Sequence, residues 1–421
     1  MPRNTIRRVR TTLLSTACLL SCMISIASAA EGEKATGFRG DGSGKYPAAT
    51  PPLEWSDTKN LKWKMEVDPA YASPILVGDK VVVASETDRI VCLNAADGKI
   101  LWNADLRSDK DLPKEVIASF KKLEAGNKMC GFAAATPASD GSSIYAVFGT
   151  GAVVAYSLDG KRKWIAFFEP AAGTFGHSAS PLVADGKVFV NLAHMLALDA
   201  QTGKVAWDQP AVPNAYGTSA LTKLNDTLVL VTPMGQVVRA SDGKVLATDI
   251  VKDLGGDEYS ISPIVEDSVA YFIDEKASAA KLTLTGDSVK SELLWQIETK
   301  EPAFASPVIK DGVIYAIGKS ANYTVIDAKT GKKLLEKVLD LPPANGTSDT
   351  HDNAVVYPSV TLGGTSLFMG NDKGDTFVVA AQPDYKELGR NTLPEGTGAS
   401  PVMSGSALYL RSGRMLYCFG K

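Results

Sequence analysis

The three histidines and five cysteines are the side chains of this 421-residue sequence best suited to metal binding or nucleophilic chemistry. His177, His194 and His351 lie far apart, and no metal-ligand spacing joins them. Cys18 and Cys22 lie near the N-terminus, and because the sequence contains no CxxC pair, it predicts neither a zinc knuckle nor a thioredoxin-like site. No nucleophile–base pair indicates a hydrolase. The sequence therefore predicts no catalytic residue.

One loop has the composition of a cation site. Residues 371–375 read "NDKGD", in which Asn371, Asp372 and Asp375 offer oxygens around Gly374, as short calcium turns do. The loop lacks the fuller ligand spacing and the closing bidentate glutamate of an EF-hand. A hairpin turn with solvated acids is the favoured interpretation, and the loop remains a weak candidate for a metal.

The elements that position the other candidate residues are indicated by a repeat. The phrase "LALDAQTGKVAW" at 196–207 returns as "VIDAKTGKKL" at 325–334, with weaker copies at 92–102 and 237–247. Each copy belongs to a unit of roughly 40 to 60 residues that opens on Ser or Thr, usually followed by Pro and an apolar strand. About eight such units occur, rich in β-branched residues and bounded by Gly/Asp turns. The sequence predicts an all-β fold, an eight-bladed β-propeller of four-stranded antiparallel blades.

The repeated phrase predicts a turn followed by a wedge. Its aspartate (Asp199 or Asp327) is expected to accept backbone N–H groups, and its glycine (Gly203 or Gly331) to adopt a positive φ. A tryptophan follows the turn, where its ring can pack between neighbouring blades; regular recurrence favours this structural role over a quinone floor. The predicted inter-blade tryptophans are Trp63, Trp102, Trp164, Trp207 and Trp295.

The last unit stops at "MLYCFGK" without an outer strand, and the missing strand is found in "NLKWKMEV", where Trp63 holds the repeat position. We therefore predict that the segment 31–66 supplies a strand that closes the last blade, and that residues 67–421 form the propeller. Cys92 and Cys418 occupy equivalent positions in the first and last blades, too far apart for a disulfide, and are predicted to be free, buried thiols. A short helix is predicted within 108–128, starting at Pro113.

Segments that lead into the inner strands would converge at one mouth of a central channel. The residues on them are Tyr71, Phe132, His177, Tyr216, Tyr259, Phe304, His351 and Tyr357. They could form an aromatic-rimmed funnel for a small ligand or a peptide. In the competing interpretation, the rings pack against loops and seal the channel, and the histidines make ordinary hydrogen bonds.

The first thirty residues have the pattern of a secretory signal peptide: four arginines, an apolar run, and Ala27-Ser28-Ala29 as a cleavage site. The apolar run is short for a membrane span. We expect an exported, periplasmic or envelope-associated monomer; Cys22, which ends "LLSC", leaves a lipoprotein as the lesser alternative. The formal net charge is −3, so no basic excess is present to attract nucleic acid.

The phrase "LALDAQTGKVAW" is similar to the A-x-D-x-x-T-G-x-x-x-W motif of the PQQ-like β-propeller repeat. This repeat is shared by pyrroloquinoline-quinone (PQQ) dehydrogenases and by the outer-membrane assembly lipoprotein BamB. The segments "FRGDGSG" (38–44) and "LYCFGK" (416–421) resemble the start and end of exported bacterial members of this family. The resemblance implies a non-enzymatic binding or assembly scaffold for envelope proteins, peptides or a small channel ligand, without a cofactor. The alternative that it implies is a quinoprotein oxidoreductase, which would hold PQQ and Ca²⁺ on the propeller axis.

Overall fold

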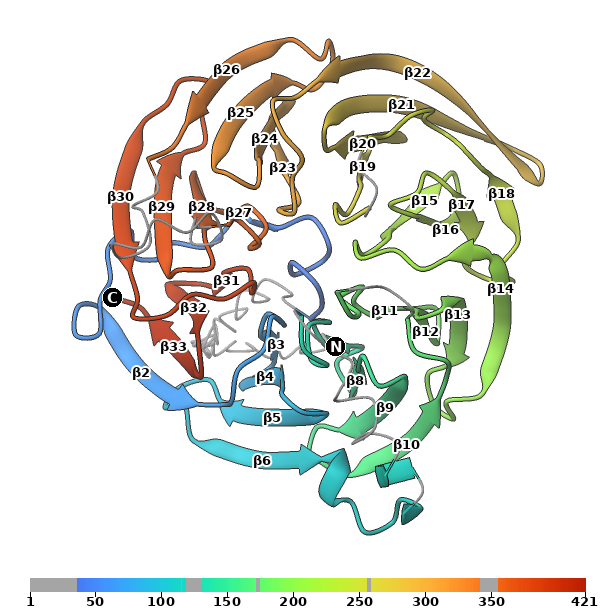
Figure 1. Cartoon of the computed structure of the whole chain (residues 1–421), viewed down its shortest axis with the longest axis vertical. Helices are drawn as coiled ribbons and strands as arrows, with labels where there is room; N and C mark the ends of the chain where they lie inside the picture. Colours follow the sequence, from blue (N-terminus) through green and yellow to red (C-terminus); the bar gives the residue numbers. More distant parts are fainter. Residues whose placement is uncertain (1–35, 115, 119–129, 172–174, 256–258, 341–354) are drawn as a thin grey trace, which may run out of the picture. The chain divides into compact units, whose positions relative to one another are not determined.

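The computed structural model describes residues 36–114, 116–118, 130–171, 175–255, 259–340 and 355–421. In this part of the chain, eight sheets of four antiparallel strands form a ring, with the first strand of most sheets near the axis and the last at the periphery (Figure 1). We number these sheets blades 1 to 8 in chain order. The predicted eight-bladed propeller is confirmed. None of the described helices is long and apolar enough to cross a membrane.

The strands of each blade are given from the axis outward. Blades 1 to 4 comprise β3 (Ile75–Val77), β4 (Lys80–Ser85), β5 (Arg89–Asn94), β6 (Ile100–Asp105); β7 (Ala138–Ser139), β8 (Ser143–Val147), β9 (Ala152–Ser157), β10 (Arg162–Phe167); β11 (Leu182–Ala184), β12 (Lys187–Asn191), β13 (His194–Asp199), β14 (Val205–Pro213); β15 (Ala220–Leu224), β16 (Thr227–Val231), β17 (Val237–Arg239), β18 (Val245–Ala247). Blades 5 to 8 comprise β19 (Ile264–Glu266), β20 (Val269–Ile273), β21 (Lys276–Thr285), β22 (Ser288–Glu298); β23 (Val308–Lys310), β24 (Val313–Ile317), β25 (Asn322–Asp327), β26 (Lys333–Val338); β27 (Thr361–Gly363), β28 (Ser366–Gly370), β29 (Asp375–Ala380), β30 (Glu387–Thr392); β31 (Val402–Ser404), β32 (Ala407–Ser412), β33 (Met415–Phe419), β2 (Leu61–Glu66).

The two middle strands of a blade are covered on both faces, because each blade lies between two neighbours. Strands such as β4 and β9 therefore read as continuous apolar runs that are almost entirely buried, whereas the outer strand β6 is largely exposed or half-buried. Between blades 1 and 2, the short helix η1 (Leu106–Ser108) is followed by a helical turn in which the Pro113 carbonyl accepts two backbone N–H groups. The remainder of the predicted segment, 119–128, lies outside the described residues.

The repeated phrase forms a receptor for the tryptophan of the preceding blade. In the turn after β13, Asp199 accepts the N–H of Thr202, and Gly203 has a φ of +70°, as the sequence predicts. The Trp164 indole N–H of blade 2 donates to the carbonyl of Ala200 at 3.0 Å, and its ring lies where a Cβ on Gly203 would be, 2.6 Å away. The same indole–carbonyl contact, at 2.9–3.0 Å, joins Trp63 to Ala95, Trp102 to Leu158, Trp207 to Ala240 and Trp295 to Ala328. The phrase is repeated because each of these five interfaces uses a carbonyl and a glycine to receive the indole.

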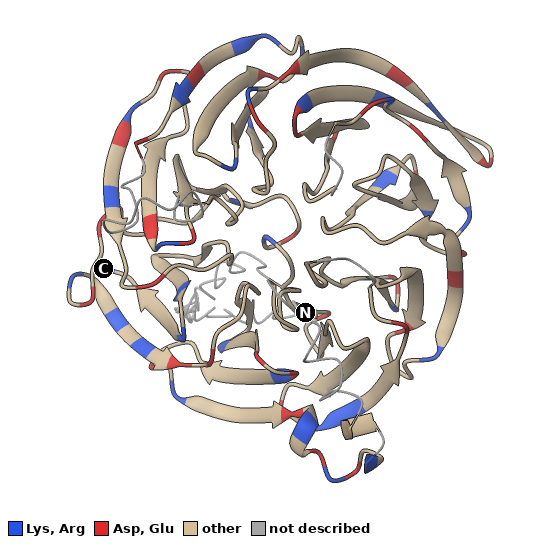
Figure 2. Cartoon of the chain, in the orientation of Figure 1, with Lys and Arg blue, Asp and Glu red and all other residues tan. Residues whose placement is uncertain are grey.

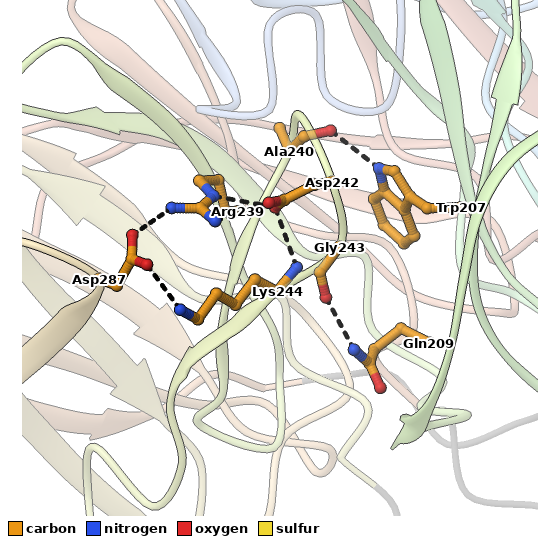
Figure 3. A network of polar contacts seen from close by, with 8 residues as sticks. All are labelled: Trp207, Gln209, Arg239, Ala240, Asp242, Gly243, Lys244 and Asp287. Carbon is orange, nitrogen blue, oxygen red and sulfur yellow. Dashed lines mark hydrogen bonds and ion pairs between the residues drawn. The ribbon is translucent and has the colours of Figure 1, made fainter.

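Between blades 4 and 5 the tryptophan is missing, and a long hairpin replaces it. Figure 3 shows the turn between β17 and β18 held from two sides. On one side, Trp207 of blade 3 donates to the Ala240 carbonyl. On the other, Asp287 at the tip of the β21–β22 hairpin accepts from Arg239 at 2.6 Å and from Lys244 at 2.7 Å. Apolar side chains of both blades form one buried cluster, so the hairpin seals this interface.

The interface between blades 7 and 8 also lacks a tryptophan on its outer strand, and Trp55 from the N-terminal segment fills it. Its ring is 4% exposed and lies 6.1 Å from that of Phe368 in blade 7 and 5.9 Å from that of Phe419 in blade 8. The repeat analysis missed this residue because Trp55 lies on no strand of a repeat unit. Between blades 6 and 7, Tyr323 and Tyr385 meet edge to face at 6.2 Å.

The ring is closed by the two ends of the described chain. Strand β2 pairs antiparallel with β33, with Trp63 opposite Cys418, which confirms the predicted closing strand. The buried Arg411 of β32 reinforces this joint, because its guanidinium donates to the carbonyls of Ala72 and Ala84 at 3.1 and 2.9 Å. Blades 8 and 1 are therefore joined at both the periphery and the inner strands.

Residues 36–44, which we name the channel segment, connect inner strands on opposite sides of the ring. The carbonyl of Thr36 accepts the N–H of Ser139 in blade 2 at 2.8 Å. Arg39 is 2% exposed and donates to the carbonyls of Pro307 and Val360, beside blades 6 and 7. Strand β1 (Lys45–Tyr46) then pairs parallel to β27, so blade 7 has a fifth strand that the sequence did not predict.

Candidate functional site

Eight hydroxyl residues form a closed hydrogen-bonded ring around the axis, one ahead of the inner strand of each blade. The backbone N–H of each donates to the side-chain oxygen of the next at 2.9–3.1 Å, and the last, Ser400, donates to the first, Ser73. All eight residues are at most 5% exposed. The members of this hydroxyl ring are Ser73, Thr136, Ser180, Thr218, Ser262, Ser306, Ser359 and Ser400.

A cavity of about 220 Å³, which we name the funnel cavity, is lined by the hydroxyl ring together with aromatic side chains. Phe38 of the channel segment lines this cavity and also a second one of about 320 Å³, so it lies at the junction between the two. The aromatic residues of the funnel cavity are Phe38, Tyr71, Phe175, Tyr216, Phe304 and Tyr357.

The aromatic residues form two groups that hold one another in place. Phe304 and Tyr357 stack with ring centroids 5.3 Å apart, and Tyr71 meets Tyr357 edge-on at 6.0 Å. In the second group, Phe175 and Tyr216 are 6.0 Å apart, and the Tyr216 hydroxyl accepts the Phe175 N–H. Burial raises the pKa of Tyr71, so its phenol stays neutral at physiological pH. The cavity therefore has aromatic walls and a polar, uncharged ring.

Four of the eight channel-mouth candidates line the funnel cavity: Tyr71, Tyr216, Phe304 and Tyr357. Phe132 is buried beneath the guanidinium of Arg107 and is not among the lining residues. Tyr259 is also absent from the lining; it has a φ of +46°, and its carbonyl accepts the N–H of Gly217. His351 lies outside the described residues.

Sequence reasoning missed Phe38, Phe175 and the hydroxyl ring. Phe175 lies two residues before His177 in the same approach segment, and no sequence periodicity indicates which of the two faces the axis. The ring did leave a sequence signal, since six of its eight members directly precede a proline. From the sequence alone this signal indicates only the start of a repeat unit, because each ring member's partner lies on another blade.

His177 is buried and is not among the residues that line the funnel cavity. Burial lowers its pKa to about 4, against a smaller opposing contribution from the Ala179 backbone. The unfolded chain, with an ordinary histidine pKa near 6.5, therefore binds more protons between these values. This contribution to stability is complete above pH 6.5 and is lost as the pH falls towards 4.

We expect this histidine to cost about 2 kcal/mol of unfolding free energy at pH 5. The check is chemical denaturation of the parent and of His177→Gln at pH 7.5 and at pH 5. The decrease in unfolding free energy between the two pH values should be smaller in His177→Gln by that amount. His194→Gln is the matched control, since His194 is partly exposed and pairs with Asp208. An equal decrease in unfolding free energy from pH 7.5 to pH 5 in the parent and in His177→Gln would contradict the prediction.

The candidate cation loop uses its oxygens within its own turn. Asn371 accepts the N–H groups of Lys373 and Asp375 and donates its amide to the Asp375 carboxylate at 3.0 Å. Asp375 also accepts from Thr392, and Asp372 accepts the N–H of Val355. Among the described residues, no three His, Cys, Asp or Glu side chains are grouped to hold a metal ion. The geometry is that of a hydrogen-bonded hairpin turn.

No disulfide joins the three cysteines in the described part of the chain. Cys92 and Cys418 are buried, and burial raises the pKa of each to about 11, so both stay protonated at neutral pH. They hold equivalent positions, because Cys92 pairs with Trp102 as Cys418 pairs with Trp63. The predicted free, buried thiols and the blade alignment are confirmed.

Charged residues of both signs are interspersed around the ring, and the inner strands carry few of them (Figure 2). The described residues that line the funnel cavity include no His, Asp, Glu, Lys or Arg. A hydroxyl nucleophile needs a neighbouring base, and none is supplied there. The arrangement is suited to binding an uncharged or acceptor-rich group.

The comparisons with known proteins agree with this architecture. The family model described as "Outer membrane protein assembly factor BamB" matches residues 55–254 and 225–419. BamB of Moranella endobia is 22% identical over 295 residues, covering 65% of this chain and 70% of that protein.

Two solved structures show the same fold. The crystal structure of BamB from Moraxella catarrhalis is similar with a TM-score of 0.61 and 14% identity, covering 86% of this chain and 99% of that one. The quinohemoprotein alcohol dehydrogenase of Comamonas testosteroni is similar with a TM-score of 0.60 and 13% identity, covering 92% of this chain and 80% of that one. These similarities establish the propeller and do not separate the two functions. The family model spans nearly the whole propeller, so the chain belongs to the family of the outer membrane protein assembly factor BamB.

Proposed function

We propose that this protein is a non-enzymatic binding and assembly scaffold of the bacterial cell envelope, whose partners are envelope proteins or peptides. The observation that carries the proposal is the match of both halves of the propeller to a family named for an assembly factor. The signal-peptide pattern of residues 1–30 supports export to the periplasm, and Cys22 leaves lipid anchoring as a variant of the same function.

The donor set of the funnel cavity argues against the quinoprotein alternative. A bound Ca²⁺ requires oxygen ligands, usually including carboxylates. The described residues that line the funnel cavity include no carboxylate to hold the metal. These lining residues therefore do not fit the calcium-bound cofactor.

The test is cross-linking in the native envelope. A C-terminally tagged chain is cross-linked in cells, purified and analysed by mass spectrometry; we expect the same envelope proteins to be recovered in each replicate. The matched control lacks residues 1–30 and should remain unexported and lose these partners.

A second measurement addresses the quinoprotein alternative. The purified protein is supplied with PQQ and Ca²⁺ and assayed for substrate-dependent dye reduction, which we expect to be absent. Dye reduction, or retention of PQQ by protein purified from the envelope, would overturn the proposal.

A further inference from the structure

The hydroxyl ring contains buried donor hydrogens without an acceptor among the described residues. Each of its oxygens accepts one backbone N–H, yet none of the eight hydroxyls donates to another described group. A hydroxyl has one hydrogen to donate, and buried donors in folded proteins are almost always paired. Eight such donors therefore remain available in residues that are 1–5% exposed.

All eight residues line the funnel cavity, so their free hydrogens share one space around the axis. Accepting an N–H bond strengthens the hydroxyl as a donor, because hydrogen bonds in a chain polarise one another. A group with acceptor oxygens would satisfy several of these donors together. An ammonium group has no acceptor to offer these hydrogens and would find no anion among the described lining residues.

The walls and the volume of the funnel cavity indicate the aromatic character and the size of a bound ligand. Tyr357 and Phe304 on one side, and Phe175 and Tyr216 on the other, present aromatic surface that favours stacked or edge-on contact with another ring. A cavity of about 150 Å³ is known to hold benzene, so the 220 Å³ here accommodates one six-membered ring with a small polar substituent.

We propose that the funnel cavity binds a single aromatic ring that carries a carboxylate or carbonyl oxygen directed at the hydroxyl ring. The occupant is either a small free aromatic acid or the aromatic carboxyl-terminal residue of a peptide, which present the same chemistry. This site is independent of the scaffold function proposed above, so failure of either leaves the other standing.

The experiment uses titration calorimetry of the full chain with four probes of similar size. Phenylacetate and phenylacetamide supply acceptor oxygens, 2-phenylethylammonium supplies only donors, and cyclohexylacetate lacks the aromatic ring. We expect one-to-one binding of the first two, at least tenfold weaker binding of the ammonium, and about fivefold weaker binding of the cyclohexyl compound. Equal binding of phenylacetate and the ammonium, or no saturable binding at millimolar concentrations, would overturn the proposal.

Substitutions in the funnel cavity test whether the ligand binds at the hydroxyl ring. Ser306 is 1% exposed, and Ser306→Ala removes both its donor hydrogen and the oxygen that accepts the Ser262 N–H. Ser306→Thr keeps both groups, and threonine already occupies ring positions 136 and 218. We expect at least a threefold loss of phenylacetate affinity in the alanine variant and recovery in the threonine variant. Phe304→Leu, away from the ring, gives a second reading if Ser306→Ala does not fold, and it should also weaken binding. Unchanged affinity in either folded variant contradicts the assignment.

The source of the ligand is decided by comparing phenylacetate with the peptide Gly-Gly-Phe and its carboxamide. Tighter binding of the peptide acid or its amide identifies a chain end as the occupant. Tighter binding of phenylacetate identifies a small free acid. Both results support the site, since they share the acceptor on one aromatic ring.

Discussion

Deletion of residues 31–66 is expected to abolish the single cooperative unfolding transition of the protein. The described part of this segment supplies strand β2, whose Trp63 is 7% exposed and wedges against blade 1. It also supplies Trp55, the wedge between blades 7 and 8, and Arg39, which binds carbonyls beside blades 6 and 7. Each buried tryptophan alone is worth about 3–5 kcal/mol, and the stability of a typical domain is about 5–15 kcal/mol.

The effect is expected to be large because every interface between blades is needed to keep the ring closed. Without β2, strand β33 exposes its backbone edge and blade 8 loses its packing against blade 1. Thermal unfolding followed by near-ultraviolet circular dichroism and by calorimetry measures the effect. Lys64→Ala on the exposed side of β2 is the control and should melt like the parent. An unchanged midpoint and enthalpy in the deletion variant would mean that the strand does not close the ring in solution.

The features that sequence analysis predicted correctly are those that depend on neighbours in the chain. The turn at Asp199 and Gly203, the strand that follows it, and the tryptophan position recur in a local phrase, and recurrence reveals a blade. The closing strand was predictable because the last unit lacked one element and the N-terminal segment contained it. Blade number and ring closure therefore follow from local patterns and their count.

The features that were missed depend on contacts between blades. Phe38 reaches the axis because Arg39 fixes the channel segment to the inner ends of blades 6 and 7, which no local pattern encodes. His177 and Phe175 share one short segment, yet only Phe175 lines the cavity. Which side chain faces the axis is set by the path of each connecting loop, and periodicity says nothing about that path.

The second large effect concerns the contact of an indole with a glycine in the repeated phrase. Gly203 and Gly186 belong to blade 3 and have nearly the same positive φ, +70° and +69°. A Cβ at Gly203 would lie 2.6 Å from the Trp164 ring, whereas a Cβ at Gly186 would meet nothing within 4 Å. We expect Gly186→Ala to cost about 1–2 kcal/mol, from the left-handed backbone alone. Gly203→Ala should cost about 1–3 kcal/mol more, because the indole has to shift.

Trp164→Ala turns this comparison into a test of mechanism. The substitution removes a buried ring and leaves the Ala200 carbonyl without its indole donor, so we expect a loss of about 3–5 kcal/mol. In the double variant with Gly203→Ala, the added methyl enters space that the indole has vacated. The combined loss should therefore fall short of the sum of the single losses by about 1–3 kcal/mol, measured by urea denaturation. The pair Trp164→Ala and Gly186→Ala should be additive. Additivity in the Gly203 pair as well would show that the glycine is required by its backbone conformation alone, and the repeated phrase would then need another explanation than a receptor for the neighbouring blade's tryptophan.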